Sequence, residues 1–326
     1  MRIVIADPNL MPQRATLEAA LPAGTLTSWH DSWNEHSVLT DLKDADVYVG
    51  PKFTGAMGAH APNVRLVHVA GAGYDGIDAD ALPAGAVCAN TFHHESSIAE
   101  YIAASLVALR RNLLGQDAAL RSGIWASSVY SQDIPQPETL RGAVVTFLGF
   151  GHIGSAAWKL LQAFGAEGIA ITRSGTVDPQ TNGLRWAGTT DRLNEALSES
   201  DILLISIPLS AETTALVSTE ELENLGAKGQ VVNVARGPVL DEAALYEALK
   251  DRKIAGAAVD VWYQYPGTDG RRVPSALPFD RLDNIIMTPH SSGVTAETFR
   301  GRAVEIAENI TRLSSNEPLK NVVISR

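Results

Sequence analysis

The chain has 326 residues, 45% apolar and 19% charged, which is the balance of an ordinary globular protein with room for two domains. Its formal net charge is −11 without any block of Lys and Arg, so neither nucleic acid nor an anionic membrane is an expected partner. No apolar run approaches the roughly 20 residues that span a bilayer, and Cys88 is the only cysteine, which excludes internal disulfides and fits a reducing cytoplasm.

Short β-branched segments alternate with segments of helical period from the start of the chain. Strands are expected at residues 2–6, 46–50 and 65–70. Because the first residues form a predicted strand, a signal peptide is not expected at the start of the sequence. A helical pattern lies between the strands 2–6 and 46–50. From Ser96 to Leu114 apolar residues recur three and four positions apart, and the serines before Ile98 supply a cap, so one long helix is predicted. The Ser- and Pro-rich segment 127–142 is predicted to be a loop.

Six further apolar strands are separated mostly by helices. They are expected at residues 143–149, 168–172, 201–208, 230–235, 256–262 and 284–289. Strands this apolar between amphipathic helices indicate parallel sheets covered on both faces, hence an α/β fold with two Rossmann-like domains. One unit precedes about residue 94, a larger one spans 95–289, and a last helix at roughly 295–313 can return to the first unit.

A G-x-G-x-x-G pattern follows the strand 144–148 and opens a helical segment. It consists of Gly149, Phe150, Gly151, His152, Ile153 and Gly154. Gly149 permits a tight turn, Gly151 lets the main chain approach a pyrophosphate, and Gly154 lets helix and strand pack closely. Because the helix N-terminus also offers unpaired N–H groups to phosphates, the pattern predicts a dinucleotide site rather than a plain β–α connection.

The next strand ends where an acidic residue would bind the ribose hydroxyls of NAD. This chain has Thr172, Arg173 and Ser174 there instead. A guanidinium and two hydroxyls suit a phosphate dianion, so the sequence favours NADP(H) over NAD(H). The alternative is that Arg173 stacks on the adenine or points into solvent.

Three polar residues follow later strands of the same predicted sheet. Arg236 ends the strand 230–235, Asp260 ends the next, and His290 follows the last. In open α/β sheets this edge binds ligands. An arginine can grip a carboxylate with two parallel hydrogen bonds, and an imidazole is a natural proton donor for reduction of a ketone.

Taken in order, the glycine turn and three later motifs closely resemble the D-isomer-specific 2-hydroxyacid dehydrogenases. The motifs are "NVARGPVLDEAAL", "AVDVW" and "TPHSSG", and upstream "HVAGAGYDGID" and "SIAEYIAASLVALRRN" look like the substrate loop and interdomain helix of that family. The resemblance, over about 65–313, implies a flavodoxin-like substrate domain (1–94 and 290–326) with a coenzyme domain (95–289) inserted into it. It also implies a cleft that closes over a small 2-oxoacid, and a homodimer joined through the coenzyme domains.

Residue roles follow from this resemblance position by position. Arg236 would bind the carboxylate and carbonyl of the substrate, while His290 would give a proton to the carbonyl oxygen as hydride arrives. Main-chain N–H groups of Ala72 and Gly73 would hold the other side of the carboxylate, and Asp260 would accept a hydrogen bond from the nicotinamide carboxamide. The cofactor would also lie against Val234, Ala235, Pro208, Thr213, Arg236 and His290.

The sequence departs from the family where a glutamate normally pairs with the histidine. Tyr265 stands at that place, before Pro266. A carboxylate raises an imidazole pKa, whereas a tyrosine only orients the ring, so we expect the reduction rate to fall off at a lower pH than in relatives. A relative that oxidises formate also lacks this glutamate.

A second departure is "NTFHHESSIAEY", which is one residue shorter than the family spacing between Asn90 and Glu100. His94 falls near the substrate-binding asparagine of the formate relative, so we expect it to line the substrate pocket. Glu95 either substitutes for the missing carboxylate or belongs to a hinge loop that caps the helix. A metal site is not expected, because the adjacent histidines His93 and His94 cannot both reach one ion from a regular helix.

The leading hypothesis is an NADP(H)-dependent reductase of small 2-oxoacids of the glyoxylate or hydroxypyruvate type. Oxidation of formate or another small oxyanion is the second enzyme reading. A nucleotide-sensing binding protein that has lost catalysis is the third. The sequence does not indicate which 2-oxoacid is preferred.

Overall fold

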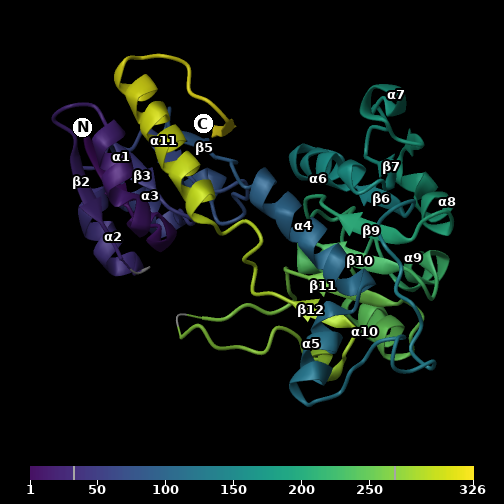
Figure 1. Ribbon diagram of the computed structural model, residues 1–326. Helices are drawn as coiled ribbons and strands as arrows, with labels where there is room; N and C mark the ends of the chain where they lie inside the picture. Colours follow the sequence, from purple (N-terminus) through teal and green to yellow (C-terminus); the bar gives the residue numbers. More distant parts are fainter. Residues whose placement is uncertain (32–33, 268) are drawn as a thin grey trace. The chain divides into compact units, whose positions relative to one another are not determined.

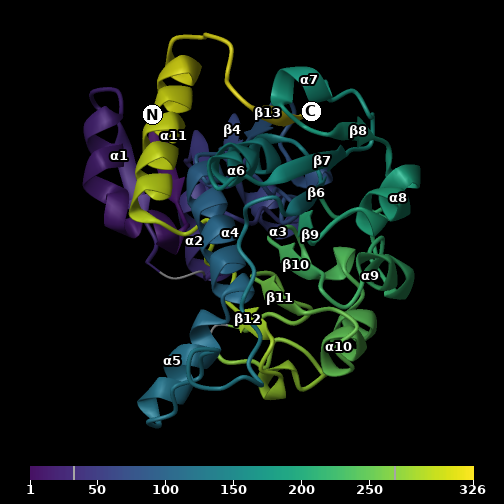
Figure 2. The ribbon, with the colours of Figure 1, turned by 45° about the vertical axis from the view of Figure 1, so that its right-hand side comes forward.

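The protein is described from a computed structural model (Figures 1 and 2). The described residues are 1–31, 34–267 and 269–326. They form two compact units, the first comprising Met1–His94 with Val294–Arg326 and the second Glu95–Gly293. Each unit contains a parallel or mostly parallel sheet with helices, which confirms the predicted α/β class.

The sheet of the first unit has the strand order β13-β5-β4-β3-β1-β2, in which only β13 is antiparallel to its neighbour. Its strands are β1 (Arg2–Ile5), β2 (Leu26–Trp29), β3 (Val47–Val49), β4 (Leu66–His68), β5 (Val87–Ala89) and β13 (Val322–Ser325). Its helices are α1 (Arg14–Ala20), α2 (Glu35–Leu42), α3 (Gly55–His60) and α11 (Ala296–Ser314). Apart from the added edge strand, this is the flavodoxin-like order. Helix α11 packs beside α1, as both views show.

The sheet of the second unit is entirely parallel and has the order β12-β11-β10-β9-β6-β7-β8. Its strands are β6 (Val144–Leu148), β7 (Glu167–Ile171), β8 (Trp186–Gly188), β9 (Ile202–Ile205), β10 (Gln230–Asn233), β11 (Gly256–Val259) and β12 (Ile285–Met287). Its helices are α4 (Glu95–Arg110), α5 (Leu113–Arg121), α6 (His152–Ala163), α7 (Pro179–Asn182), α8 (Leu193–Ser198), α9 (Thr219–Leu225) and α10 (Glu242–Lys250). The strand order reverses between β6 and β9, and Rossmann folds bind dinucleotides beside that point.

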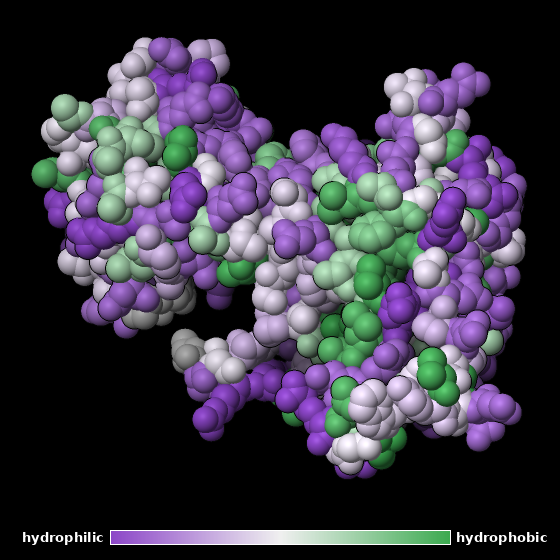
Figure 3. Space-filling model, viewed as in Figure 1, coloured by the Kyte–Doolittle hydropathy of each residue, from purple (hydrophilic) through white to green (hydrophobic). Residues whose placement is uncertain are grey.

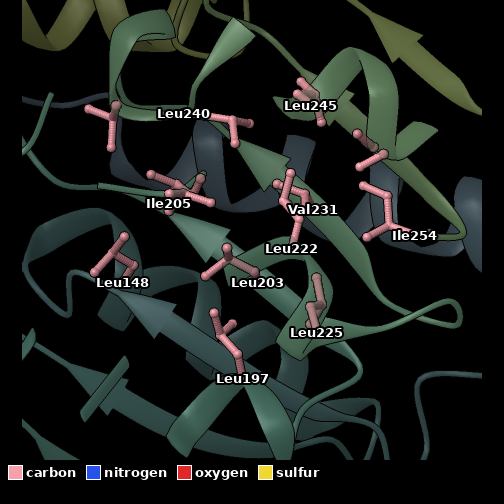
Figure 4. Close-up of a cluster of buried hydrophobic side chains, with 14 of the residues drawn as sticks. Leu148, Leu197, Leu203, Ile205, Leu222, Leu225, Val231, Leu240, Leu245 and Ile254 are labelled. Carbon is pink, nitrogen blue, oxygen red and sulfur yellow. The ribbon is translucent and has the colours of Figure 1, made fainter. Parts of the chain in front are cut away.

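Two apolar layers fix this sheet. Helices α4 and α6 cover one face, with Phe147 and Trp158 in the layer between. Leucine, isoleucine and valine side chains under α8, α9 and α10 fill the other face (Figure 4), among them Leu203, Val231 and Leu245. Burial of one such side chain stabilises the folded state by about 1.5–3 kcal/mol. The two layers therefore keep the strands that carry the site residues in fixed positions.

Two expectations about elements are wrong. The predicted helix 96–114 ends at Arg110, because Asn112 adopts a left-handed conformation (φ 46°) that interrupts helical hydrogen bonding before α5 begins. The short strand β2 lies inside the region predicted as helical. Its four residues alternate poorly, and Leu26 is 67% exposed, so strand pairing with β1 rather than local pattern places it in the sheet.

Candidate active site

Apart from Glu95, which begins α4, the predicted cofactor and catalytic residues of the second unit follow carboxyl ends of its strands. Because every strand pair in this sheet is parallel, those ends share one edge. The glycine turn follows β6, the segment 172–174 follows β7, Arg236 follows β10, and Asp260 follows β11. Ligands of open α/β sheets bind at this edge.

The glycine turn has the conformation that its sequence requires. Gly149 has a φ of 97°, and a Cβ there would lie 2.8 Å from the carbonyl oxygen of Ser206. A Cβ at Gly154 would overlap the carbonyl oxygen of Gly149. At Gly151, by contrast, a Cβ would meet nothing within 4 Å, so the main chain faces open space where a phosphate can approach.

Gly151 is also the N-cap of α6, and no side chain caps this helix end. The first turn carries no acidic residue, so its N–H groups and the helix dipole favour an anion. His152, exposed at this end, lies with Nδ1 3.6 Å from a carboxylate oxygen of Glu95 at the start of α4. The residues of the turn therefore fit the pyrophosphate of a dinucleotide.

The segment after β7 presents polar groups to solvent. The Thr172 hydroxyl accepts a hydrogen bond from the Gly175 N–H (3.0 Å) and shapes the turn, while Arg173 and Ser174 are exposed. The Ser174 hydroxyl lies 2.8 Å from that of Thr176, a residue the sequence analysis did not select. A guanidinium beside paired hydroxyls fits a phosphate group.

Buried Asn233, at the end of β10, shapes the turn that carries Arg236. Its carboxamide oxygen accepts from the Ala235 N–H (3.0 Å), and its amide donates to the Arg236 carbonyl (3.2 Å). The half-buried Arg236 side chain donates to the Ala235 carbonyl (2.8 Å). Val234 and Ala235 are buried in this turn, and on the loop after β9 the Thr213 hydroxyl donates to the Pro208 carbonyl (2.8 Å).

His290 pairs with the tyrosine that replaces the family glutamate. The Tyr265 hydroxyl lies 3.1 Å from His290 Nδ1 and accepts a hydrogen bond from the Trp262 N–H (3.2 Å). The Tyr265 hydroxyl can therefore donate its own proton to Nδ1 of His290. In the neutral imidazole the ring proton is then on Nε2. Burial raises the pKa of Tyr265, so the phenol contributes no charge to the pair near neutral pH.

The charged groups around His290 shift its pKa in opposite directions. Partial burial lowers the pKa of His290 below its ordinary value, and the Arg236 guanidinium lowers it further. The Asp260 carboxylate acts in the opposite direction but is outweighed. The imidazolium that would donate a proton is therefore less stable here than on a free histidine.

In the first unit the substrate-loop candidates lie after β4. The carbonyl of Ala72 accepts a hydrogen bond from the Asn90 side chain (2.8 Å), and the adjacent Gly73 is exposed. His94 is buried, and its Nδ1 lies 3.2 Å from a guanidinium nitrogen of Arg302 on α11. Because a guanidinium can only donate, Nδ1 accepts and the neutral ring of His94 carries its proton on Nε2.

The structure brings most second-unit candidates to one sheet edge, and Ala72, Gly73 and His94 belong to the other unit. The Glu95 carboxylate lies beside the ring of His152, whereas the ring of His290 meets Tyr265. A role for Glu95 as a substitute carboxylate stays a prediction.

In the described part of the chain, no helix is both long and apolar enough to cross a membrane. The same residues form no cluster of three or more metal-ligating His, Cys, Asp or Glu side chains.

Sequence reasoning missed several residues that shape these turns. They are Asn90, Tyr101, Asn233, Thr288, Ser292 and Arg302. Arg302 left a weak signal, since it falls on the same face of the last helix as Phe299 and Ile306. A charged residue at such a position needs a buried partner.

Parallel strands, a glycine turn open to a phosphate and a paired histidine at the same edge define an α/β protein that binds a dinucleotide. Residues 103–292 match the family model described as the D-isomer specific 2-hydroxyacid dehydrogenase, NAD binding domain. The chain belongs to the D-isomer specific 2-hydroxyacid dehydrogenase family, and its cofactor is a nicotinamide dinucleotide. The resemblance seen in the sequence is confirmed.

Individual relatives agree with this assignment. The chain is 30% identical to a D-3-phosphoglycerate dehydrogenase of Methanocaldococcus jannaschii over 89% of its length, yet it spans only 53% of that protein. It is 31% identical to a glyoxylate reductase of Thermofilum pendens, covering 86% of this chain and 78% of the relative. Among solved structures, an NADPH-dependent glyoxylate/hydroxypyruvate reductase of Sinorhizobium meliloti is similar, with 28% identity, a TM-score of 0.79, and coverage of 100% of this chain and 99% of that one.

Proposed function

We propose that this protein is an NADPH-preferring reductase that converts small 2-oxoacids of the glyoxylate or hydroxypyruvate type into D-2-hydroxyacids. The observation that carries the proposal is the common sheet edge of the glycine turn, Arg236 and the Tyr265–His290 pair. The names of the relatives from Thermofilum pendens and Sinorhizobium meliloti support the substrate class.

Each residue has a chemical task in this proposal. When bound, the nicotinamide cofactor supplies hydride to the carbonyl carbon. Arg236 grips the substrate carboxylate and polarises the carbonyl, and His290 gives the proton to the carbonyl oxygen. The N–H groups of Ala72 and Gly73 bind the far side of the carboxylate, and His94 lines the substrate pocket.

The remaining tasks concern the cofactor. We assign its pyrophosphate to the glycine turn with His152 and Ile153, and its 2′-phosphate to residues 172–174. Asp260 is the proposed acceptor for the carboxamide, and Val234, Ala235, Pro208 and Thr213 line the bound dinucleotide. A cytoplasmic location stays a prediction from the single cysteine.

The direct test is the disappearance of reduced nicotinamide absorbance with NADPH and a panel of 2-oxoacids, with formate and NADP⁺ as a further arm. Turnover of glyoxylate or hydroxypyruvate supports the proposal. Turnover of formate alone supports oxyanion oxidation. No turnover despite tight NADPH binding supports a nucleotide-sensing protein, and either of the last two results overturns the proposal.

Replacing Arg173 with Ala tests the cofactor preference. One lost charge-assisted contact to phosphate weakens NADPH binding by about 10- to 100-fold, since such bonds contribute about 1.5–3 kcal/mol. NADH, which lacks the 2′-phosphate, binds as before. Dissociation constants measured for both cofactors check this, with Arg192→Ala as the control because Arg192 pairs with Glu195 on the same unit. Equal losses for NADPH and NADH would refute the assignment.

The pH dependence of reduction follows from the lowered pKa of His290. Proton donation requires the imidazolium, so kcat/KM falls as pH rises through that pKa, below the ordinary pKa of histidine. Tyr265→Glu places a negative charge beside Nδ1 and moves the fall-off upward by about 1–2 pH units. Tyr265→Phe, which adds no charge, produces no upward shift. An unchanged profile for Tyr265→Glu would contradict the pairing.

A homodimer through the second unit is the expected assembly. No residue of helix α5 is buried, and its apolar side chains Leu114 and Leu120 are 59% and 52% exposed. An isolated nine-residue helix is marginal in water, so α5 needs a covering surface. Apolar side chains also gather on this unit where α4 and α6 lie (Figure 3), with Leu160 exposed on α6 and Phe164 exposed directly after it.

The double change Leu114→Asp with Leu120→Asp is therefore expected to convert the dimer into a monomer. Light scattering during size-exclusion chromatography measures the mass. Leu26→Asp is the control, because Leu26 is also exposed (67%) but lies in the first unit. A wild-type protein that elutes as a monomer at all concentrations would rule out this assembly.

A further inference from the structure

The carboxylate of Asp260 is fully buried and receives four hydrogen bonds. Its donors are the Thr288 hydroxyl (2.6 Å), the Ser291 N–H (2.9 Å), the Ser292 N–H (3.0 Å) and the Ser292 hydroxyl (2.5 Å). Four donors on one carboxylate hold it in a single orientation. Asp260 therefore acts on the segment 288–292 as a clamp.

The clamp holds His290 in a conformation that it would not adopt freely. His290 has a φ of 56°, in the left-handed region, and its N–H donates to the Asp260 carbonyl (2.8 Å). A non-glycine residue there costs about 1–3 kcal/mol and persists only where its surroundings fix it. The hydrogen bonds to Asp260 on both sides of His290 provide that constraint.

The clamp extends to helix α4 through one tyrosine. The Tyr101 hydroxyl lies 2.8 Å from the Thr288 hydroxyl, and both side chains are partly buried. The single hydroxyl proton of Thr288 is already donated to Asp260, so its oxygen must accept from Tyr101. The chain thus has one direction, from Tyr101 to Thr288 to Asp260.

We propose that Tyr101 and Thr288 are positioning residues for the proposed reductase, since together they hold Asp260 and so fix His290 in the orientation for proton transfer. Neither residue contacts the reacting atoms in this assignment. Without the Tyr101 hydroxyl, the Thr288 oxygen loses its donor and the side chain is free to rotate away from Asp260. The inference rests on the proposed function for its kinetic consequences, but the clamp itself is a feature of the second unit alone.

Kinetics of four variants test the chain of hydrogen bonds. Tyr101→Phe and Thr288→Val each lower kcat about tenfold, as one lost hydrogen bond to a charged network implies, with little change in KM. Thr288→Ser keeps the hydroxyl and stays near wild type. The double variant is no worse than Thr288→Val, because both changes break one chain. Tyr263→Phe is the matched control, since its hydroxyl donates to the Leu240 carbonyl (2.9 Å) in the same unit.

A titration of the His290 ring by NMR gives a readout independent of turnover. The titratable and charged groups acting on the ring from the described second unit are Asp260, Arg236 and Tyr265. The Asp260 carboxylate raises the pKa of His290 and the Arg236 guanidinium lowers it, so a turn released from Asp260 changes the distances of the ring from these charges and shifts its pKa. Tyr101→Phe and Thr288→Val should both show a shift relative to the wild type, and Tyr263→Phe should not.

The outcomes separate the clamp from the proposed function. A wild-type protein that reduces no 2-oxoacid refutes the function, while the titration still decides the clamp. Additive effects of Tyr101→Phe and Thr288→Val, or a titration in both variants equal to that of Tyr263→Phe, overturn the positioning role.

Discussion

Replacement of His290 by Gln lowers kcat for glyoxylate reduction by about 10²- to 10⁴-fold, the usual contribution of a positioned general acid. Without the imidazolium, hydride addition must leave an alkoxide that only water can protonate. Glutamine keeps a polar side chain of comparable length, so the NADPH dissociation constant stays close to that of the wild type. Stopped-flow kinetics of NADPH oxidation measure the chemical step.

The comparison with Tyr265→Phe separates orientation from proton transfer. That variant removes the hydroxyl 3.1 Å from Nδ1 but keeps the proton-bearing ring, so its kcat falls far less. A His290→Gln enzyme that retains wild-type kcat would show that another group supplies the proton, and Glu95→Gln then becomes the informative variant. An unchanged pH profile for Glu95→Gln excludes Glu95 as the substitute carboxylate.

Replacement of Arg236 by Lys lowers kcat/KM by about 10²- to 10³-fold although the positive charge is retained. A lysine ammonium cannot make two parallel hydrogen bonds to a carboxylate, and each charge-assisted bond contributes about 1.5–3 kcal/mol. Because Asn233 shapes the turn through the main chain of Ala235 and Arg236, the fold around the site survives the change. Steady-state kinetics with glyoxylate provide the measurement.

Arg185→Lys is the matched control for this change. Arg185 lies in the same unit and makes two exposed ion pairs, with Glu167 and Glu199, each at 3.5 Å. Such surface pairs contribute roughly 0–1 kcal/mol, so kcat/KM should stay within about twofold of wild type. If Arg236→Lys behaved like Arg185→Lys, the arginine would not be the carboxylate ligand.

The features of the site that depend on residues close together in the sequence could be predicted from local sequence patterns. The glycine turn was predictable because the G-x-G-x-x-G spacing lies within six residues between a strand and a helix, and at Gly154 the steric demand is itself local, since a Cβ there would overlap the carbonyl oxygen of Gly149. The edge position of Arg236, Asp260 and His290 was predictable because parallel strands end together. The replacement of a glutamate by Tyr265 was visible only through the family resemblance.

Contacts between distant segments were not predictable in the same way. His94 and Arg302 are 208 positions apart, and their pairing depends on how α11 packs in the first unit. The contact of the Glu95 carboxylate with His152 depends on the packing of α4 against α6. Sequence spacing placed Glu95 near the active edge but could not choose its partner.

The proposed chemistry is tested most directly by the fate of the hydride. Hydroxypyruvate would be reduced with NADPH that carries deuterium at both C4 positions of the nicotinamide, and the product resolved by chiral chromatography with mass spectrometry. The proposal predicts D-glycerate with one deuterium on C2. The L-isomer, or D-glycerate without deuterium at C2, would contradict direct hydride transfer to a carbonyl held between Arg236 and His290.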